Sequence, residues 1–225
     1  MPQKLALPIN KCTITAMYKT DSPGYHEWDT THYGVDMTGS VNPFYASGNG
    51  TVVDVGGSAT TGVGFWAAIR YNDVYKWNSS SPSSLTAIGD VIVRYFHLKA
   101  KPSLTKGQAV TLDTAVGTYA NTGGWTMGNH LHVEVDTDVK NPLYTPTLGS
   151  ASGGLQAGAR NDKDTTIDPM TVFFRKTTAP ESQTITYSQS YCAANHLIKP
   201  ANTTRCSGGL KYINTAKVTT MPTRT

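Results

Sequence analysis

Two of the chain's six histidines, His130 and His132, flank a single leucine in the segment GNHLHVEV at residues 128–135. The apolar residues of this segment alternate with the polar ones, which predicts a β-strand with one buried face. Side chains two positions apart on a strand point to the same side, with Cα atoms about 7 Å apart. The two imidazoles can therefore be metal ligands, an acid–base pair, or polar residues on a solvated face, and this spacing alone leaves all three open. Glu134 shares their face, and we expect a solvated rim carboxylate there rather than a partner that orients a histidine.

A second set of candidate ligands lies in the segment HYGVD, where His32 and Asp36 are four residues apart. Residues four apart on a regular strand share a face, and Gly34 between them permits a tight backbone path. Two neutral imidazoles and one carboxylate are a common ligand set of catalytic zinc, and such a set leaves the remaining position to water. His32, Asp36 and one histidine of the 130/132 pair meet this requirement.

A further histidine, His97, lies near the end of the apolar segment VIVRYFHL at 91–98. A lone histidine at the end of a buried strand is by default a core or edge residue. Its chemistry depends on whether the fold brings it to the other histidines, so His97 is kept as a candidate.

Short strands must position these residues, because the chain has 21 glycines and 12 prolines and no long segment with helical periodicity. We therefore expect a mostly β fold with little helix. The content of 38% hydrophobic and 15% charged residues indicates a folded domain rather than a disordered chain. Strands are expected at 48–55, 64–71, 91–98 and 130–135, with two more within 105–120. The Ser- and Asn-rich stretch 72–90 is expected to form a long surface loop.

Composition and charge argue against several classes of protein. No apolar run reaches the roughly 18 residues that suggest a membrane span. The net charge of +4 is mild, and the chain has no dense Lys/Arg run of the kind expected for nucleic-acid binding. The N-terminal segment MPQKLALPINKC lacks the regions of a signal peptide. We therefore expect a protein that is cytosolic at birth, exported by another route, or supplied as a mature fragment.

The character of the chain changes after residue 175, since residues 176–225 contain six basic residues and one acidic residue. We expect one domain over 1–175, followed by a basic extension that either binds the cell wall or a partner, or packs on the domain. The three cysteines, Cys12, Cys192 and Cys206, include no Cys-x-x-Cys, which argues against a cysteine-based zinc site. Either Cys192 and Cys206 form a disulfide, or all three are free.

The order of the three histidine motifs resembles that of the lysostaphin-type zinc endopeptidases, also called the LytM family. The matching segments are HYGVD at 32–36, YFHL at 95–98 and HLH at 130–132. The segments GNGTVVDVG at 48–56 and KGQAVTLDTAVGTYANTGG at 106–124 are similar to segments between the family's motifs. The resemblance covers roughly residues 5–175 and implies antiparallel sheets that form a groove with the zinc site, joined by long loops.

The resemblance also implies roles for single residues. His32, Asp36 and His132 match the zinc ligands of the family, whereas His130 and His97 match its two catalytic histidines that do not bind the metal. The chain has no His-Glu-x-x-His helix that would place a glutamate beside the metal. We therefore expect His130 to be the base and His97 to stabilise the oxyanion or donate a proton.

Tyr25 and His26 precede the first ligand by a few residues and are further candidates for contact with substrate or oxyanion. Their order in the chain is the basis of this expectation.

By this resemblance the chain is a Zn2+-dependent endopeptidase that hydrolyses peptide cross-links or stem peptides of bacterial peptidoglycan. A zinc-activated water would be the nucleophile, with two assisting histidines. We expect it to act on the cell wall, in an extracellular or periplasmic setting or as a phage-encoded lysis or virion protein. One alternative is a non-enzymatic wall-binding or structural module, such as a phage tail-associated part, that retains the zinc site. Another is a zinc hydrolase or hydratase with a different substrate, against which the His-x-x-x-Asp motif argues.

Overall fold

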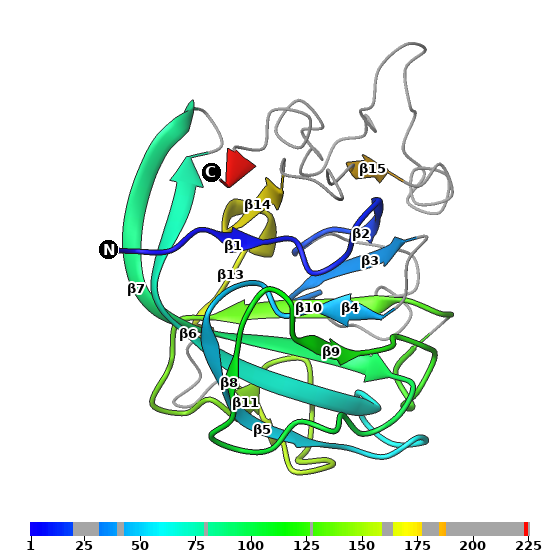
Figure 1. Cartoon of the computed structure of the whole chain (residues 1–225). Coiled ribbons are helices and arrows are strands. Elements are labelled where there is room, and N and C mark those ends of the chain that lie inside the picture. The colour runs from blue at the N-terminus through cyan, green and yellow to red at the C-terminus, as the bar shows by residue number, and fades with distance from the viewer. Residues whose placement is uncertain are drawn as a thin grey trace.

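The computed structural model describes residues 1–19, 32–39, 43–78, 81–126, 128–158 and 164–176, and two further strands, β15 (Ile185–Tyr187) and β16 (Thr223–Arg224). Regular structure in this part of the chain is almost entirely β-strand (Figure 1). Its one helical element is a short 3-10 turn, η2 (Pro169–Thr171), at whose start the Asp168 carboxylate accepts a hydrogen bond from the Met170 N–H. The mostly β fold with little helix that the sequence predicts is confirmed.

A nine-stranded sheet forms the centre of the protein. Its strands follow the order β15, β2 (Cys12–Ala16), β3 (Val35–Gly39), β10 (Leu131–Asp136), β7 (Ser81–Leu98), β6 (Phe65–Asn78), β5 (Gly50–Gly56) and β8 (Ala109–Val110). The ninth strand, β13 (Thr166–Ile167), pairs with β10 beyond the residues that pair with β3. Neighbouring strands are antiparallel, except that β15 and β2 are parallel.

Three smaller sheets complete the described strands. They pair β1 (Leu5–Ala6) with β14 (Phe173–Lys176) and β14 with β16, β4 (Phe44–Tyr45) with β9 (Ala115–Gly117), and β11 (Tyr144–Thr145) with β12 (Gln156–Ala157). The first of these sheets brings the N-terminal segment against the strand that follows η2 (Figure 1).

The central strand β10 is buried on both faces. Leu131, Val133 and Val135 belong to the larger apolar core, as the alternation in the sequence predicts. The intervening residues of β10 face the other side of the sheet and are also buried. A second apolar cluster covers neighbouring strands on that side and consists of Val63, Trp66, Ala68, Ile92, Phe96, Leu148 and Leu155. Polar side chains on this face of β10 are therefore shielded from bulk water.

The expected surface loop over 72–90 is wrong, because β6 and β7 continue through most of this stretch as one long antiparallel hairpin (Figure 1). Its composition is typical of a loop, but tertiary packing overrides that tendency. Val74 and Trp77 are buried, and the Trp77 Nε1–H donates to the Phe173 carbonyl at 3.0 Å. On the other side, the Tyr75 N–H donates to the Gln3 carbonyl at 3.0 Å. The hairpin thus packs against β14 and forms a backbone hydrogen bond with the N-terminal segment.

Two short pieces of the 176–225 extension contact the rest of the chain, since β15 pairs with β2 and β16 pairs with β14. The proposed boundary at 175/176 stays a prediction. Cys192 and Cys206 lie outside the described residues, so their pairing also stays a prediction. Cys12 is a free, buried thiol on β2, and burial raises its pKa to about 12.

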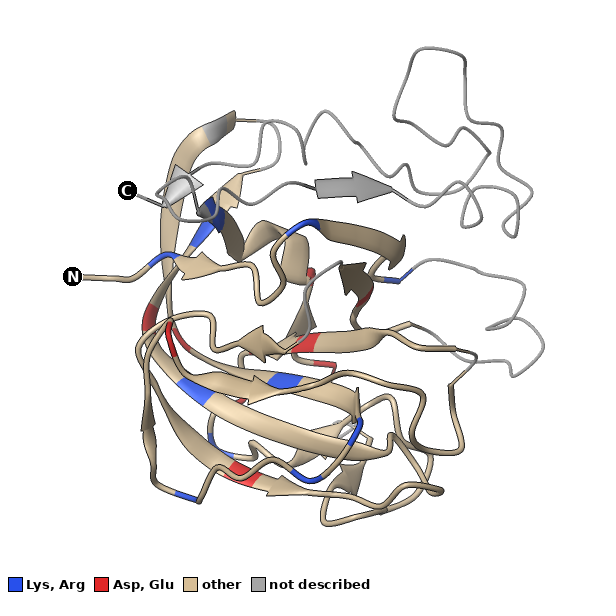
Figure 2. Ribbon diagram, turned by 45° about the vertical axis from the view of Figure 1, so that its right-hand side comes forward, with Lys and Arg blue, Asp and Glu red and all other residues tan. Residues whose placement is uncertain are grey.

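Charged side chains are few and scattered along the described strands (Figure 2). Among the described residues, no helix is both long and apolar enough to cross a membrane.

Replacement of Trp77 tests whether the hairpin is an integral part of the fold. Trp77→Ala removes a fully buried side chain and its hydrogen bond to Phe173, so we expect the free energy of unfolding to fall by about 3–5 kcal/mol. Trp125, which is 40% exposed, is the matched control, and Trp125→Ala should change that free energy by at most about 0.5 kcal/mol. Urea unfolding followed by circular dichroism measures both. Equal, small effects of the two replacements would show that the hairpin does not pack as described.

Candidate metal centre

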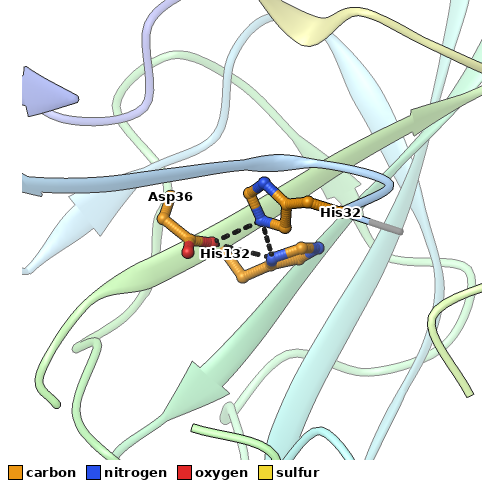
Figure 3. A group of neighbouring side chains, drawn as sticks. All are labelled: His32, Asp36 and His132. Atoms are coloured by element: carbon orange, nitrogen blue, oxygen red, sulfur yellow. Dashed lines mark hydrogen bonds and ion pairs between the residues drawn. The ribbon is translucent and has the colours of Figure 1, made fainter. Parts of the chain in front are cut away.

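The pairing of β3 with β10 brings two of the candidate ligands together. Asp36 and His132 are direct register partners on these antiparallel strands. Val35 and Met37, on either side of Asp36, belong to the larger apolar core, so alternation turns Asp36 to the opposite face. His32 lies just before β3, and its ring reaches back over the same face (Figure 3).

Three ligand atoms converge at this point (Figure 3). His32 Nε2 lies 3.0 Å from Asp36 Oδ1 and 3.0 Å from His132 Nδ1, and His132 Nδ1 lies 2.8 Å from Asp36 Oδ1. All three residues are buried. The structure therefore brings together the three residues that the sequence singles out as ligands, and their role as ligands stays a prediction.

Neighbouring groups determine which nitrogen of His32 faces the cluster and keep the Asp36 carboxylate charged. His32 Nδ1 lies 2.7 Å from the Met17 carbonyl oxygen. A carbonyl can only accept, so Nδ1 donates this hydrogen bond, and in the neutral ring the lone pair of Nε2 faces Asp36 and His132. Burial alone would raise the pKa of Asp36, but His32, His130 and His132 lower it well below its ordinary value, so the carboxylate stays charged.

This donor set fits a zinc ion. Two imidazole nitrogens and one carboxylate oxygen are typical ligands of a catalytic zinc site, and a tetrahedral ion with bonds of about 2.0–2.2 Å separates its ligand atoms by roughly 3.3 Å. The separations of 2.8 to 3.0 Å between the three atoms are a few tenths of an ångström shorter. A small outward displacement of the side chains would accommodate the ion.

Gly34 lets the first motif pass directly over the ring of His132. A Cβ atom built on Gly34 would lie 2.5 Å from His132 Nε2 and 2.5 Å from the Val133 carbonyl oxygen. Real Cβ contacts are essentially never this short. The tight path expected at Gly34 therefore has a specific cause, which is close approach of the backbone to a ligand side chain.

A β-bulge places His97 beside the cluster. Leu98 pairs with Phe65 and Tyr95 pairs with Ala67, so two residues of β7 lie opposite one residue of β6. His97 takes the left-handed conformation there, with φ +62°. Without the bulge, strict alternation would turn His97 to the side of Tyr95 and into the larger core. With it, the His97 ring centre lies 4.7 Å from that of His130. Nothing in the local sequence signals this bulge.

Backbone hydrogen bonds hold the two remaining histidines next to each other. The Ala120 N–H donates to the His97 carbonyl at 2.8 Å, and the Ala120 carbonyl accepts from the His130 N–H at 3.1 Å. The ring centres of His97 and His132 are 6.1 Å apart. All four motif histidines therefore gather at one end of β7 and β10, around Asp36.

The tautomers of these two histidines follow from their partners. His97 Nδ1 lies 2.8 Å from the Thr122 carbonyl, and His130 Nδ1 lies 2.8 Å from the Gly128 carbonyl. Each Nδ1 must therefore donate, which leaves Nε2 as the unprotonated nitrogen of the neutral ring. His130 Nε2 lies 3.6 Å from Asp36 Oδ1. Burial lowers the pKa of His97 to about 3, so this ring is neutral near pH 7.

The expectation that Glu134 is a solvated rim carboxylate is wrong. Its side chain is fully buried and forms an ion pair with Arg94, which is fully buried as well. The reason is the second apolar cluster. It covers the face of β10 that the alternating sequence pattern predicts to be solvated. Arg94 is not among the candidates that the motifs supply, although an arginine inside the apolar segment VIVRYFHL indicates a buried charge that requires a partner.

Tyr25 and His26 lie outside the described residues, so their suggested contact with substrate stays a prediction. The catalytic roles assigned to His97 and His130 also stay predictions.

No protein-family model matches the chain, and no curated protein matches its sequence. Among solved structures, a zinc-containing peptidase from Vibrio cholerae matches with 27% identity and a TM-score of 0.42, over 60% of this chain and 37% of that one. The SpoIIQ–SpoIIIAH pore-forming complex matches with 14% identity and a TM-score of 0.47, over 77% of this chain and 92% of that one. Lysostaphin from Staphylococcus simulans, an antimicrobial peptidase, matches with 19% identity and a TM-score of 0.46, over 76% of this chain and 52% of that one.

This chain thus spans less than two thirds of the length of two of these proteins, the Vibrio cholerae peptidase and lysostaphin. In structure it is similar to lysostaphin-type peptidases, the family whose histidine motifs its own motifs resemble.

Proposed function

We propose that this protein is a zinc-dependent endopeptidase that cleaves peptide cross-links or stem peptides of bacterial peptidoglycan. The observation that carries the proposal is the convergence of His32 Nε2, Asp36 Oδ1 and His132 Nδ1 within one buried cluster. Two further imidazoles, whose Nδ1 atoms donate to backbone carbonyls, lie beside it. This donor set supports zinc-assisted catalysis, whereas peptide cleavage, the peptidoglycan substrate and action at the cell wall come from the resemblance of the motifs.

In this proposal His32, Asp36 and His132 hold the ion. Bound zinc supplies Lewis-acid activation of a water molecule and of the scissile carbonyl. The hydrogen bond from His32 to Met17 keeps its Nε2 directed at the ion. Both faces of β10 are buried, so the ligands lie in an environment where electrostatic interactions are stronger than in water.

His130 is the residue best placed to take up the proton of the attacking water. Its Nε2 is the acceptor, because its Nδ1–H donates to Gly128. Asp36 Oδ1 lies 3.6 Å from this nitrogen. The same proton is then available for the leaving amine.

His97 differs from His130 in its ability to hold a charge. Its Nε2 is also an acceptor, but burial lowers its pKa to about 3 and disfavours the imidazolium. A neutral His97 in this tautomer has no proton on Nε2 to give to an oxyanion. We therefore propose that neutral His97 assists as a hydrogen-bond acceptor at Nε2, next to His130, rather than as a proton donor or a general base.

Metal removal gives the most direct test of the proposed activity. Purified peptidoglycan should be cleaved by the zinc-loaded protein, and a chelator should abolish cleavage because the ion supplies the Lewis acid. Added zinc should restore it. Mass spectrometry of the digest identifies new peptide termini and hence the bond. A protein that binds one zinc ion but cleaves none of several wall types would instead support a wall-binding or structural module.

Alanine replacements separate the ligand from the neighbouring histidine. His132→Ala should lose both bound zinc and activity, whereas His130→Ala should keep zinc and lose turnover by about 10²–10⁴-fold, the usual contribution of general acid–base catalysis. His97→Ala should also keep zinc and lose activity. Metal content by mass spectrometry and digestion rates measure these effects. Loss of zinc from His130→Ala would contradict the assignment within the pair, and full activity of His97→Ala would remove that residue from the catalytic set.

Gly34 allows a test of the site that leaves every ligand in place. Gly34→Ala puts a methyl group against His132 Nε2 and Val133 O, so the imidazole must move, and we expect zinc affinity to fall on the order of tenfold or more. Gly149→Ala is the control, because its Cβ would meet no atom within 4 Å. Zinc titration of the metal-free proteins measures both. Unchanged affinity in Gly34→Ala would mean that the first motif does not cross His132 as described.

A further inference from the structure

A cluster of buried charges lies on the same face of the sheet as the candidate metal centre. Arg94 on β7 and Glu134 on β10 are register partners, and both side chains are fully buried. Arg94 Nη1 donates to Glu134 Oε2 at 3.2 Å, and Nη2 donates to Asp136 Oδ2 at 2.9 Å. Its Nε donates to the Pro142 carbonyl at 3.0 Å. Each nitrogen of the guanidinium therefore has an acceptor.

Such a cluster is a costly way to stabilise a fold. Transfer of Arg94 and its carboxylate partners from water to the interior has a desolvation cost that their attraction often does not offset. Apolar side chains of similar volume frequently stabilise a protein as well or better. On β7, the two positions that flank Arg94 on this face, Ile92 and Phe96, are apolar. A specific role of the Glu134 carboxylate would account for its presence among them.

The carboxylate of Glu134 is held from several sides. Thr145 Oγ1 lies 2.9 Å from Oε1 and 2.8 Å from Oε2, and the Thr147 hydroxyl donates to Oε1. Together with the ion pair to Arg94, these bonds fix the orientation of the group. They leave Oε1 at 3.6 Å from His132 Nε2.

His132 Nε2 is the buried polar atom that this arrangement faces. Among the described residues it has no hydrogen-bond partner, and it is shielded from solvent. If Nδ1 gives its lone pair to a metal ion, the proton of the neutral ring must reside on Nε2. A buried N–H requires an acceptor, and Glu134 Oε1 is the carboxylate oxygen beside it.

We propose that Glu134, held by Arg94, Thr145 and Thr147, is the positioning residue of His132: it accepts the Nε2–H and so directs Nδ1 to the metal ion. This inference rests on the proposed zinc site. Metal-ligating histidines commonly donate their second nitrogen in this way, and loss of the acceptor weakens metal binding.

Two further residues line the pocket around His132. The ring stacks on Phe96, with centres 5.4 Å apart and planes at 6°, and Gly34 passes close to Nε2. Accommodation of zinc requires Nδ1 to move slightly away from His32 and Asp36. A shift of Nε2 by roughly 0.4 Å toward Glu134 Oε1 would bring these two atoms from 3.6 Å to within hydrogen-bond distance.

Zinc titration of the full chain tests the proposal. The metal-free wild type, Glu134→Gln and Asp136→Asn are compared, because both variants take one carboxylate from Arg94 but only Glu134 lies against His132. We expect zinc to bind Glu134→Gln about 10–100-fold more weakly than the wild type. Asp136→Asn should bind zinc as the wild type does. The absorption spectrum of bound Co²⁺ should likewise change in Glu134→Gln and not in Asp136→Asn.

The possible results separate this inference from the proposed function. No zinc binding by the folded wild type would contradict the metal centre itself. Zinc binding by the wild type with no loss in Glu134→Gln, or with equal losses in both variants, would overturn the role of Glu134 alone. If Glu134→Gln does not fold, the double variant Arg94→Met/Glu134→Leu removes the buried pair together, and weaker zinc binding by it is the expected result.

A measurement on the zinc-loaded wild type does not depend on any variant. Nitrogen-15 NMR of the histidine side chains should show His132 with a metal-bound Nδ1 and a protonated Nε2 whose proton exchanges slowly with water. A metal-bound Nε2, or an Nε2 proton in rapid exchange, would overturn the proposal.

Discussion

The register between β3 and β10 is the constraint on which the site depends. It sets Asp36 directly opposite His132, and antiparallel partners on one face lie close enough for their side chains to meet. A shift of β10 by one residue would turn His132 into the apolar core and bring Leu131 or Val133 to the site instead. The apolar residues of these two strands therefore determine the metal centre as much as its ligands do, because their burial opposes any other register.

Two local departures from regular strand geometry complete the arrangement. The bulge in β7 turns His97 from the core to the face that carries His132, and the missing side chain at Gly34 lets the first motif lie over the His132 ring. A left-handed conformation is unfavourable for a residue with a side chain. The hydrogen bonds of the His97 backbone to Val63 and Ala120 hold it in place. Both departures lie beside the site, where positioning of a functional group is their evident result.

Burial on both faces of β10 links the metal centre to the second apolar cluster and to the charges within it. The ring of His132 touches Phe96 on one side, while Glu134 and Arg94 form an ion pair in the same layer. In such surroundings an unpaired polar atom is costly. Hydrogen bonds and ion pairs here therefore have larger interaction energies than at a surface. Each group restricts the orientation of its neighbours. This is why the orientation of one imidazole can depend on an arginine that does not contact it.

The sequence by itself determined the residue types and the local periodicity. The alternation at 130–135 was sufficient to predict a strand with both histidines on one face, and the spacing of His32 and Asp36 was sufficient to propose them as ligands with one histidine of that pair. The scarcity of helical patterns correctly indicated a β fold. These features are local, since a strand's two-residue period and a ligand's chemistry are encoded within a few positions of the chain.

Tertiary structure decided the rest. The 72–90 stretch has the composition of a loop. It forms a hairpin because this part of the chain packs against the N-terminal segment and β14, which are distant in the sequence. Burial of Glu134 required a second layer over the sheet. The placement of His97 required a bulge that depends on the register with β6. Each of these outcomes arises from contacts between distant segments, and the pattern of a single segment contains no signal for them.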